Sequence, residues 1–519
     1  MNLLPHIPVL RRGKAYESLD KINVVNHRTG ETIAQVSSVN AGIIRKDLQR
    51  IGESRDALKK FSVAQLIEIS AKAGELFLNG TLPFGDKGHT QSPQEYVETL
   101  SSTSGLPHVM VRRNMTKIHH ALTNLKTILN GLTRGLDLSI LDDGFGEQFG
   151  TKLSFFPTTQ ALGLVMPSNS PAVNSLWLPA IALKIPVIIK PGKEEPWTPY
   201  RLIQSFIAAG CPAEAFGFYP TDHEGAAEIL KSCGRALIFG DKNTMAQYAN
   251  NPSIQLHGPG WSKILIGDDE IENWRDYLAV MVSSIFDNGG RSCINASAIV
   301  VPKYAAEIAD ALAQKLGTIA PTKPDDENAK LSGFANVKMA EFIDAQIEEG
   351  LKTPGATDVT AKYRDSSLSP HEARMGREPE KGVIDETGSS SPRPSPLLGE
   401  EREKLSRASR KTEFDGGTYM RPTIVLCDSF AHPLANKEFL CPYASVVEVP
   451  QNEMLKQIGY SLAVTAITKD AKFIEQLTEF PHIERLNIGP ISTMKISWDQ
   501  PHEGNMFEFL YKRRSIERA

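Results

Sequence analysis

Cys293 is the residue of this sequence whose surroundings best suit covalent chemistry. Residues 287–293 read Asp-Asn-Gly-Gly-Arg-Ser-Cys, which predicts a tight turn, and the apolar residues 298–301 predict a buried strand after it. A cysteine fixed between a turn and a strand has a defined direction and a backbone N–H beside it. That arrangement suits a thiolate nucleophile and the oxyanion that its attack creates. On residue type alone, a cysteine packed as a small hydrophobic side chain is the favoured alternative.

Lysines and glycines at the ends of predicted strands form a second candidate for chemistry. From residue 161, short apolar strands alternate with helical segments, which predicts a mostly parallel sheet. Ligands bind such sheets outside the carboxyl ends of the strands. A phosphate-bearing cofactor is favoured there over lysines that are merely solvated. The predicted strands are residues 162–167, 187–191, 236–240 and 263–266, with a helix over 173–184, and the polar strand ends are 168–171, 190–193 and 240–242.

The rest of the chain predicts the elements that would hold these residues. A hairpin is expected over residues 24–36, helices over 41–80 and on to about 135, and an extended ribbon over 152–157. Apolar strands are expected over 423–426, 444–449 and 462–467. The segment 363–412 is rich in Ser, Pro, Arg and Glu and predicts a disordered surface insertion without a catalytic part. A partner-binding arm is the alternative reading of that segment.

Composition limits the classes of function. The chain has 519 residues, enough for two or more domains, and 41% hydrophobic and 23% charged residues, as in ordinary globular proteins. A net charge of −4 gives no reason to expect nucleic acid or an anionic membrane as partner. The five cysteines form no CxxC pair, which favours a reducing compartment without a disulfide framework, and no metal site is predicted. With neither a secretory signal nor a membrane span, a cytoplasmic protein is expected.

Seven motifs in one order resemble the aldehyde dehydrogenase superfamily over nearly the whole chain. The resemblance implies an α/β fold with a Rossmann-type cofactor domain (1–141 and 158–266), an α/β catalytic domain (267–482) and a small bridging β-ribbon (142–157 and 483–519). It also implies a homo-oligomer held together by those bridging segments. The motifs lie at residues 26–33, 167–171 (with Ser168 where the family has Trp), 189–196, 209–212, 288–293, 419–424 and 438–442.

The same resemblance implies roles for individual residues. Cys293 would attack an aldehyde or thioester carbonyl, and the Asn169 amide would donate to the oxyanion beside the Cys293 backbone N–H. A hydride would pass between the substrate and NAD or NADP. The implied cofactor-binding residues are Lys190 at the adenosine ribose, Glu438 at the nicotinamide ribose, and Pro167, Lys193 and Gly240. A family-like scaffold that has lost catalysis is the non-enzyme alternative.

The expected acyl acceptor is inferred from Gln255, where the sequence departs from the motif of the hydrolytic family members. Hydrolytic members carry Glu-Leu-Gly-Gly-Lys, whose glutamate activates water, whereas residues 255–259 here read Gln-Leu-His-Gly-Pro. An amide cannot take a proton from water, and no carboxylate lies between Asp241 and Asp268. Residues 258–260 resemble CoA-acylating members, so transfer between an aldehyde and CoA is predicted, with hydrolysis as the alternative. His257 is a possible base, displaced roughly 6–7 Å along an extended chain from Gln255.

Two further departures concern the cofactor and the tail. Lys193 stands where NAD-preferring relatives usually have glutamate, which favours NADP or tolerance of both, although Glu194 and Glu195 weaken that inference. The tail does not match the family's usual sequence. His502 and Glu503 are placed either near the substrate entrance or on the surface, and neither is assigned a role.

Overall fold

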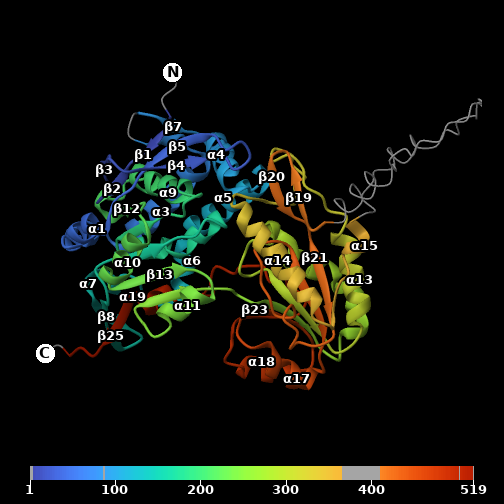
Figure 1. Cartoon of the computed structure of the whole chain (residues 1–519). Helices are drawn as coiled ribbons and strands as arrows, with labels where there is room; N and C mark the ends of the chain where they lie inside the picture. Colours follow the sequence, from blue (N-terminus) through green and yellow to red (C-terminus); the bar gives the residue numbers. More distant parts are fainter. Residues whose placement is uncertain (1–3, 86–87, 365–408, 502, 518–519) are drawn as a thin grey trace, which may run out of the picture.

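Two seven-stranded sheets organise the chain. The computed structural model describes residues 4–85, 88–364, 409–501 and 503–517 (Figure 1). The first sheet belongs to the blue-to-green half of the sequence and the second to the later, green-to-red half. Among the described residues, no helix has the length and apolar character to cross a membrane.

The first sheet is the predicted parallel sheet. Five of its strands run parallel, and β2 and β3 from the N-terminal segment add to one edge as an antiparallel hairpin. The chain proceeds outward from β10 in one direction and then returns to build β13 on its other side, so the strand order reverses at β10 and opens a crevice at the carboxyl ends. In spatial order the strands are β14 (Ile254–His257), β13 (Arg235–Phe239), β10 (Leu162–Val165), β11 (Val187–Lys190), β12 (Phe216–Phe218), β2 (Val9–Arg11) and β3 (Lys14–Tyr16).

The second sheet carries the nucleophile loop. The strands predicted over 423–426, 444–449 and 462–467 are confirmed as β21, β22 and β23, and β16 follows Cys293 as expected. All neighbours are parallel except β18, which runs antiparallel to β21. The order is β18 (Ala356–Asp358), β21 (Thr423–Cys427), β22 (Tyr443–Glu448), β16 (Ala296–Val301), β15 (Ser262–Ile266), β23 (Ser461–Ile467) and β24 (Ile483–Ile488).

One strand was predicted in the wrong sheet. Residues 263–266 were expected as the fourth strand of the first sheet, but β15 pairs with β16 and β23 in the second, and β14 takes the expected place beside β13. All five residues of β15 are buried. A strand covered on both faces has the same apolar pattern in either sheet, so the sequence could not distinguish the two positions. Similarly, β24 pairs with β23, although residues 483–488 were expected in a bridging segment.

Helices cover the sheets where the apolar periodicity predicts them. α3 begins with a reciprocal capping box between Ser62 and Gln65, which satisfies backbone donors at its first turn. The helix expected over 173–184 is instead a 3₁₀ turn and a short helix, with Pro171 and Pro179 at their starts. These helices include α3 (Val63–Asn79), α4 (Pro93–Ser104), α5 (His108–Thr123), α6 (Leu125–Leu132), η1 (Pro171–Leu176), α8 (Leu178–Ala182), α9 (Trp197–Ala208), α12 (Leu278–Phe286), α14 (Val337–Lys352) and α19 (Met506–Leu510).

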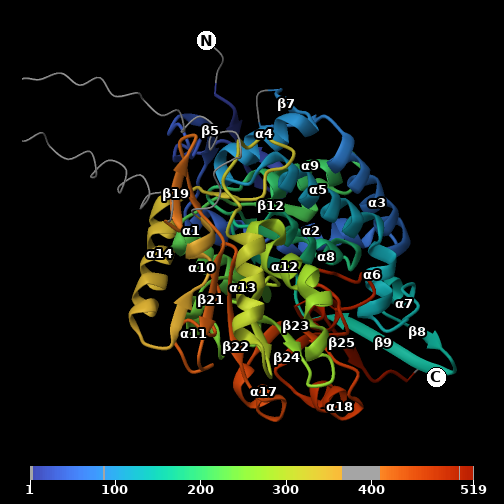
Figure 2. The ribbon, with the colours of Figure 1, turned by 90° about the vertical axis from the view of Figure 1, so that its right-hand side faces the viewer.

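Smaller elements complete the described chain. The hairpin predicted over 24–36 is confirmed as β4 (Lys21–Val25) and β5 (Thr32–Ser37). The predicted ribbon is β8 (Phe145–Gln148) and β9 (Thr151–Pro157), to which β25 (Tyr511–Arg514) adds a third strand, and Figure 2 shows it extending from the body. The remaining helices are α1 (Ala41–Leu48), α2 (Ile51–Lys59), α7 (Ile140–Asp143), α10 (His223–Ser232), α11 (Lys242–Tyr248), α13 (Ala305–Leu316), α15 (Ala361–Arg364), α17 (Gln451–Ile458) and α18 (Ala471–Glu479).

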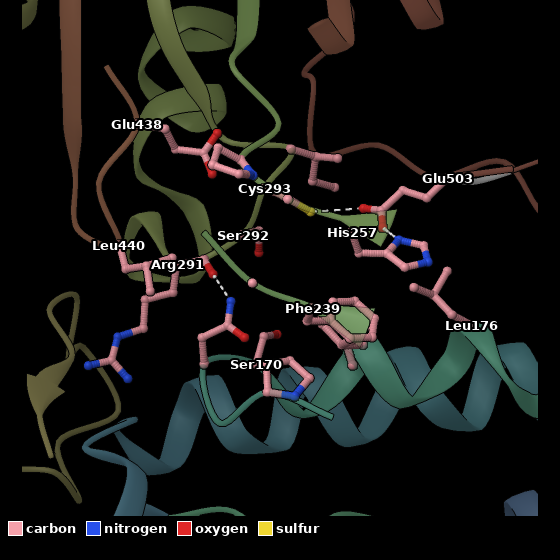
Figure 3. A pocket seen from close by; sticks show the side chains of 18 of the residues that line it. Ser170, Leu176, Phe239, His257, Arg291, Ser292, Cys293, Glu438, Leu440 and Glu503 are labelled. Carbon is pink, nitrogen blue, oxygen red and sulfur yellow. Dashed lines mark hydrogen bonds and ion pairs between the residues drawn. The ribbon is translucent and has the colours of Figure 1, made fainter. Parts of the chain in front are cut away.

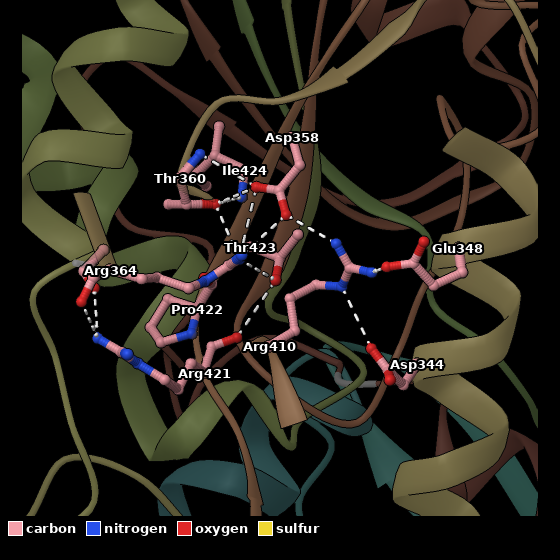
Figure 4. Close-up of polar contacts among 11 residues, drawn as sticks. Asp344, Glu348, Asp358, Thr360, Arg364, Arg410, Arg421, Pro422, Thr423 and Ile424 are labelled. Atoms are coloured by element: carbon pink, nitrogen blue, oxygen red, sulfur yellow. Dashed lines mark hydrogen bonds and ion pairs between the residues drawn. The ribbon is translucent and has the colours of Figure 1, made fainter. Parts of the chain in front are cut away.

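The insertion predicted over 363–412 falls mainly on residues 365–408, which lie outside the described residues. The predicted segment was too long at both ends, because α15 ends at Arg364 and β19 (Lys411–Phe414) begins immediately after Arg410. The two arginines are buried and each donates to Asp358 at 2.9 Å (Figure 4). A buried carboxylate shared by two guanidinium groups therefore fixes both ends of the segment in the folded body.

Candidate active site

A left-handed turn directs the nucleophile loop. Asn288, Gly289 and Gly290 have φ values of 58°, 65° and 68°, a conformation that asparagine tolerates and glycine adopts freely. At Gly290 a Cβ atom would lie 2.4 Å from the backbone carbon of Cys441, so this position accepts only glycine without movement of the backbone. The turn predicted from the sequence is therefore present, and Cys293 follows it three residues later.

A buried polar network supports the turn from below. The Asn114 amide donates to Asn288 at 2.8 Å, and its carbonyl oxygen accepts from Ser170 at 3.1 Å. The buried guanidinium of Arg291 donates to the carbonyl of Ser104 at 2.9 Å and also to that of Gly333. These bonds join the loop to α4, α5 and the turn after β10, which gives Cys293 a fixed backbone.

Asn169 lies beside this loop, as predicted. Its Nδ2 donates to the carbonyl of Arg291 at 3.0 Å, two residues before Cys293. Its Oδ1 is buried and lacks a hydrogen-bond partner among the described residues. One of the two amide N–H groups thus anchors the side chain to the loop, and the other remains for a ligand on the same wall of the cavity.

A cavity of about 820 Å³ opens between the two sheets at this point. Five of the seven predicted site residues line it, namely Pro167, Asn169, Gly240, Cys293 and Glu438. Neither of the two predicted lysines is among the lining residues: Lys190 is half-buried at the end of β11, and Lys193 is exposed. Glu194 lines the cavity instead, which removes the argument from Lys193 for NADP over NAD.

Burial changes the charges expected along this wall. Glu438 accepts from the backbone N–H of Trp261 at 2.7 Å, and burial raises the pKa of its carboxyl group to about 8. Burial lowers the pKa of the neighbouring Lys263 ammonium to about 7. Near neutral pH both groups therefore carry less charge than their residue types suggest.

Glu503, which the sequence left without a role and placed either near the substrate entrance or on the surface, lies at the nucleophile. One carboxylate oxygen accepts from Cys293 Sγ at 2.9 Å, and the other pairs with Nδ1 of His257 (Figure 3). The Gln255 amide donates to the main-chain carbonyl of Glu503. His257 was expected as a displaced base, and the structure shows it in contact with Glu503 and stacked on Phe239, with ring centroids 4.6 Å apart.

This carboxylate affects the cysteine directly. Burial raises the pKa of the Cys293 thiol well above its usual value, and the adjacent Glu503 carboxylate raises it further. The resting nucleophile is therefore a thiol that donates to a carboxylate, and a proton acceptor for it is already in contact. Although no carboxylate lies between Asp241 and Asp268 in the sequence, the folded site contains one, that of Glu503.

Comparisons of the sequence with known proteins give consistent matches to one family. The sequence model of the aldehyde dehydrogenase family matches residues 112–369. An aldehyde dehydrogenase family protein of Staphylococcus haemolyticus is 21% identical over 347 residues, which are 65% of this chain and 68% of the relative. The malonate-semialdehyde dehydrogenase of Listeria monocytogenes is 23% identical over 332 residues, 61% of this chain and 58% of the relative. The chain belongs to the aldehyde dehydrogenase superfamily.

Solved structures of aldehyde dehydrogenases match the fold over almost its full length. KauB from Pseudomonas aeruginosa superposes with a TM-score of 0.73 at 14% identity, covering 99% of this chain and 96% of that protein. Indole-3-acetaldehyde dehydrogenase, solved with NAD⁺, gives 0.72 at 16% identity, covering 99% and 97%. The predicted fold class is thereby confirmed, as is the predicted enzyme class, an NAD(P)-dependent aldehyde dehydrogenase.

Proposed function

We propose that this aldehyde dehydrogenase oxidises its substrate through a covalent bond to Cys293. The observation that carries the proposal is the position of Cys293 Sγ in a cavity whose wall also holds Asn169. Attack of sulfur on an aldehyde carbon places a negative charge on oxygen, and the free N–H of the Asn169 amide and the Cys293 backbone N–H are the proposed donors to it. Removing a donor of this kind typically costs about a hundred- to a thousandfold in rate.

The crevice at the carboxyl ends of the first sheet fits a nicotinamide dinucleotide. Pro167 and Gly240 lie where the strand order reverses, the usual ligand position in such sheets. The loops there pack closely, because a Cβ at Gly192 would lie 2.3 Å from the Ser168 hydroxyl. Among structural neighbours, one is solved with NAD⁺ and another is named as NADP-dependent. Lys190 and Glu438 would hold the riboses of NAD or NADP, which accepts the hydride when bound.

The cavity wall also suggests a class of aldehyde. Trp498 and Met506 from the C-terminal segment join apolar residues of α6 and η1 along it. Such a wall favours an apolar chain or ring by removing it from water, at roughly 25 cal/mol per Å² of buried area. We therefore propose an apolar aldehyde as substrate. The apolar lining on this side is Ile128, Leu132, Val173, Leu176, Ile496, Trp498 and Met506.

Two acyl acceptors are candidates for the second half of the reaction. Coenzyme A is the acceptor predicted from the sequence, and Gly258 and Pro259 of the motif behind that prediction line the cavity. Water is favoured by a separate observation, the contact between Glu503 and Cys293. The geometry supports water better, because a carboxylate at the sulfur can serve as the base that water requires.

The proposed chemistry is tested by following NAD or NADP reduction with hexanal, benzaldehyde and malonate semialdehyde. We expect turnover with wild type, none above background with Cys293→Ala, and a higher kcat/KM for the two apolar aldehydes. An intact-mass increase on Cys293 should appear when turnover is stopped with acid. Cofactor reduction that survives Cys293→Ala would refute the covalent mechanism, and a preference for malonate semialdehyde would refute only the substrate class.

A further inference from the structure

The main chain at Glu503 adopts a costly conformation. Glu503 has φ of 54° and Gly504 has φ of 94°, both in the left-handed region. For a residue other than glycine, this region costs roughly 1–2 kcal/mol. Such a conformation persists only where surrounding contacts determine it, and it often marks a functional site. Here the contacts are the Gln255 amide at the Glu503 carbonyl and the His257 imidazole at its carboxylate.

The Glu503 side chain is also buried. It is 7% exposed, and that of His257 is 4% exposed. A carboxylate in such a place must be compensated by hydrogen bonds or by charge. Each of its oxygens has a partner, the thiol of Cys293 on one side and the imidazole of His257 on the other. The arrangement places a proton acceptor against the nucleophile and an N–H donor behind that acceptor.

We propose that Glu503 is the general base of this enzyme and that His257 positions it, so that water releases the acyl group from Cys293. The proposal rests on the proposed function, since it requires a thioester on Cys293. Gln255 occupies the position that a glutamate has in hydrolytic relatives. As an amide it cannot accept the proton, but it can hold the carbonyl of the segment that supplies the carboxylate.

One base, Glu503, is enough for the proton transfers of both acylation and deacylation. As Sγ bonds to the aldehyde carbon, the thiol proton passes to the Glu503 carboxylate, and that proton reaches solvent after the hydride has left the substrate. The ionised carboxylate then takes a proton from water while the oxygen of that water bonds to the thioester carbon. When the carbon–sulfur bond breaks, Glu503 returns the proton to Cys293 and the product is a carboxylic acid. Per aldehyde, one water is consumed and one hydride is transferred.

Charged groups around Glu503 and His257 affect how the deacylation rate depends on pH. Besides Cys293 and His257, the charges that act on Glu503 come from Glu438, Tyr460 and Arg485. The imidazole N–H stabilises the ionised carboxylate, so its removal disfavours the form that acts as base. Replacing His257 with Phe should therefore move the acid limb of the deacylation rate to higher pH, an effect that a purely structural role would not produce.

p-Nitrophenyl acetate separates acylation from deacylation without any cofactor. Acetylation of Cys293 releases one nitrophenolate per site as a burst, and the slower steady rate that follows reports hydrolysis of the thioester. We expect Glu503→Gln to keep the burst amplitude, to accumulate acetyl-enzyme by intact mass, and to lower the steady rate by about a hundredfold or more. Formate should partly restore the steady rate of Glu503→Ala but not that of His257→Phe.

Matched controls separate this inference from the proposed function. Glu508 lies in the same segment with an exposed carboxylate paired with Arg134, and Glu508→Gln should match wild type. Loss of the burst in Cys293→Ala, with an unchanged steady rate in Glu503→Gln, would overturn the general base and leave the nucleophile in place. A burst that persists in Cys293→Ala would overturn the proposed function itself.

An experiment on the wild-type enzyme alone also shows whether water or CoA accepts the acyl group. Oxidation of hexanal in ¹⁸O-labelled water should give hexanoic acid carrying the label over many turnovers, at a rate that CoA does not change. An acyl-enzyme that accumulates and is released only by CoA would overturn the proposal. This measurement holds even where Glu503→Gln does not fold.

Discussion

Gly504 offers a precise way to displace Glu503 without touching it. A Cβ at this position would lie 2.2 Å from Nε2 of Gln255, the atom that donates to the Glu503 carbonyl. Ordinary contacts begin near 3.4 Å, so Gly504→Ala requires a separation of about 1 Å at a hydrogen bond that cannot then survive. A shift of that size passed on to Glu503 would lengthen and weaken the contact between its carboxylate and Cys293 Sγ, now 2.9 Å.

Gly489 supplies the matched control. Its φ of 92° is almost that of Gly504, and a Cβ there would meet no atom within 4 Å. Both alanine variants should lose roughly 1–2 kcal/mol of stability from the left-handed backbone, measured by urea unfolding. Only Gly504→Ala should also lower the steady rate with p-nitrophenyl acetate, by about tenfold or more, in keeping with the large effect of an ångström-scale misplacement. Equal steady rates in the two variants would refute the claim that Gln255 and Gly504 place the base.

Four further outcomes follow from individual contacts. Glu503→Gln removes a carboxylate that raises the pKa of Cys293, so the pH profile of alkylation by iodoacetamide should move to lower pH, and a profile that stays in place would contradict the contact. Asn169→Ala should slow the nitrophenolate burst by about a hundred- to a thousandfold while iodoacetamide alkylation is unchanged. Phe239→Ala removes the ring stacked on His257 and should slow deacylation up to about tenfold, given roughly 0.5–1.5 kcal/mol for such pairs. Asp358→Asn removes the carboxylate that Arg364 and Arg410 share, while Arg410 keeps Asp344 and Glu348, and should cost about 3–5 kcal/mol in urea unfolding. Asp428→Asn at an exposed site should cost little.

Local patterns were enough to predict the elements that hold the nucleophile. Residues 288–290 predict the turn before Cys293, and the apolar run 298–301 predicts the strand after it, so both follow from one short stretch of sequence. Asn169 was placed near the sulfur only because residues 167–171 resemble a motif of the aldehyde dehydrogenase superfamily. The sheet to which β15 belongs was not predictable, because burial on both faces removes the pattern that distinguishes one sheet from another.

The role of Glu503 could not be assigned in this way. It lies 210 residues from Cys293 in sequence, in a tail without a recognisable motif, and tertiary contacts alone bring the two together. The available signal was indirect: a polar amide at Gln255 where a carboxylate is expected, and a glycine after a tail glutamate. Neither feature predicts the other until the folded chain places Gln255 against the Glu503 carbonyl.

The pairing of Gln255 with Glu503 has a simple electrostatic reason. A glutamate at 255 would place a second negative charge beside a buried carboxylate, and two carboxylates that share a site cannot both remain ionised at ordinary pH. An amide has nearly the same shape, carries no charge and donates an N–H, so it accommodates the tail and also binds its main chain. The loss of a base at one position therefore does not imply the loss of base catalysis, because the amide that replaces it creates the binding site for a carboxylate carried by another part of the chain. For Cys293, what matters is that an acceptor lies 2.9 Å from the sulfur, not which strand or loop supplies it.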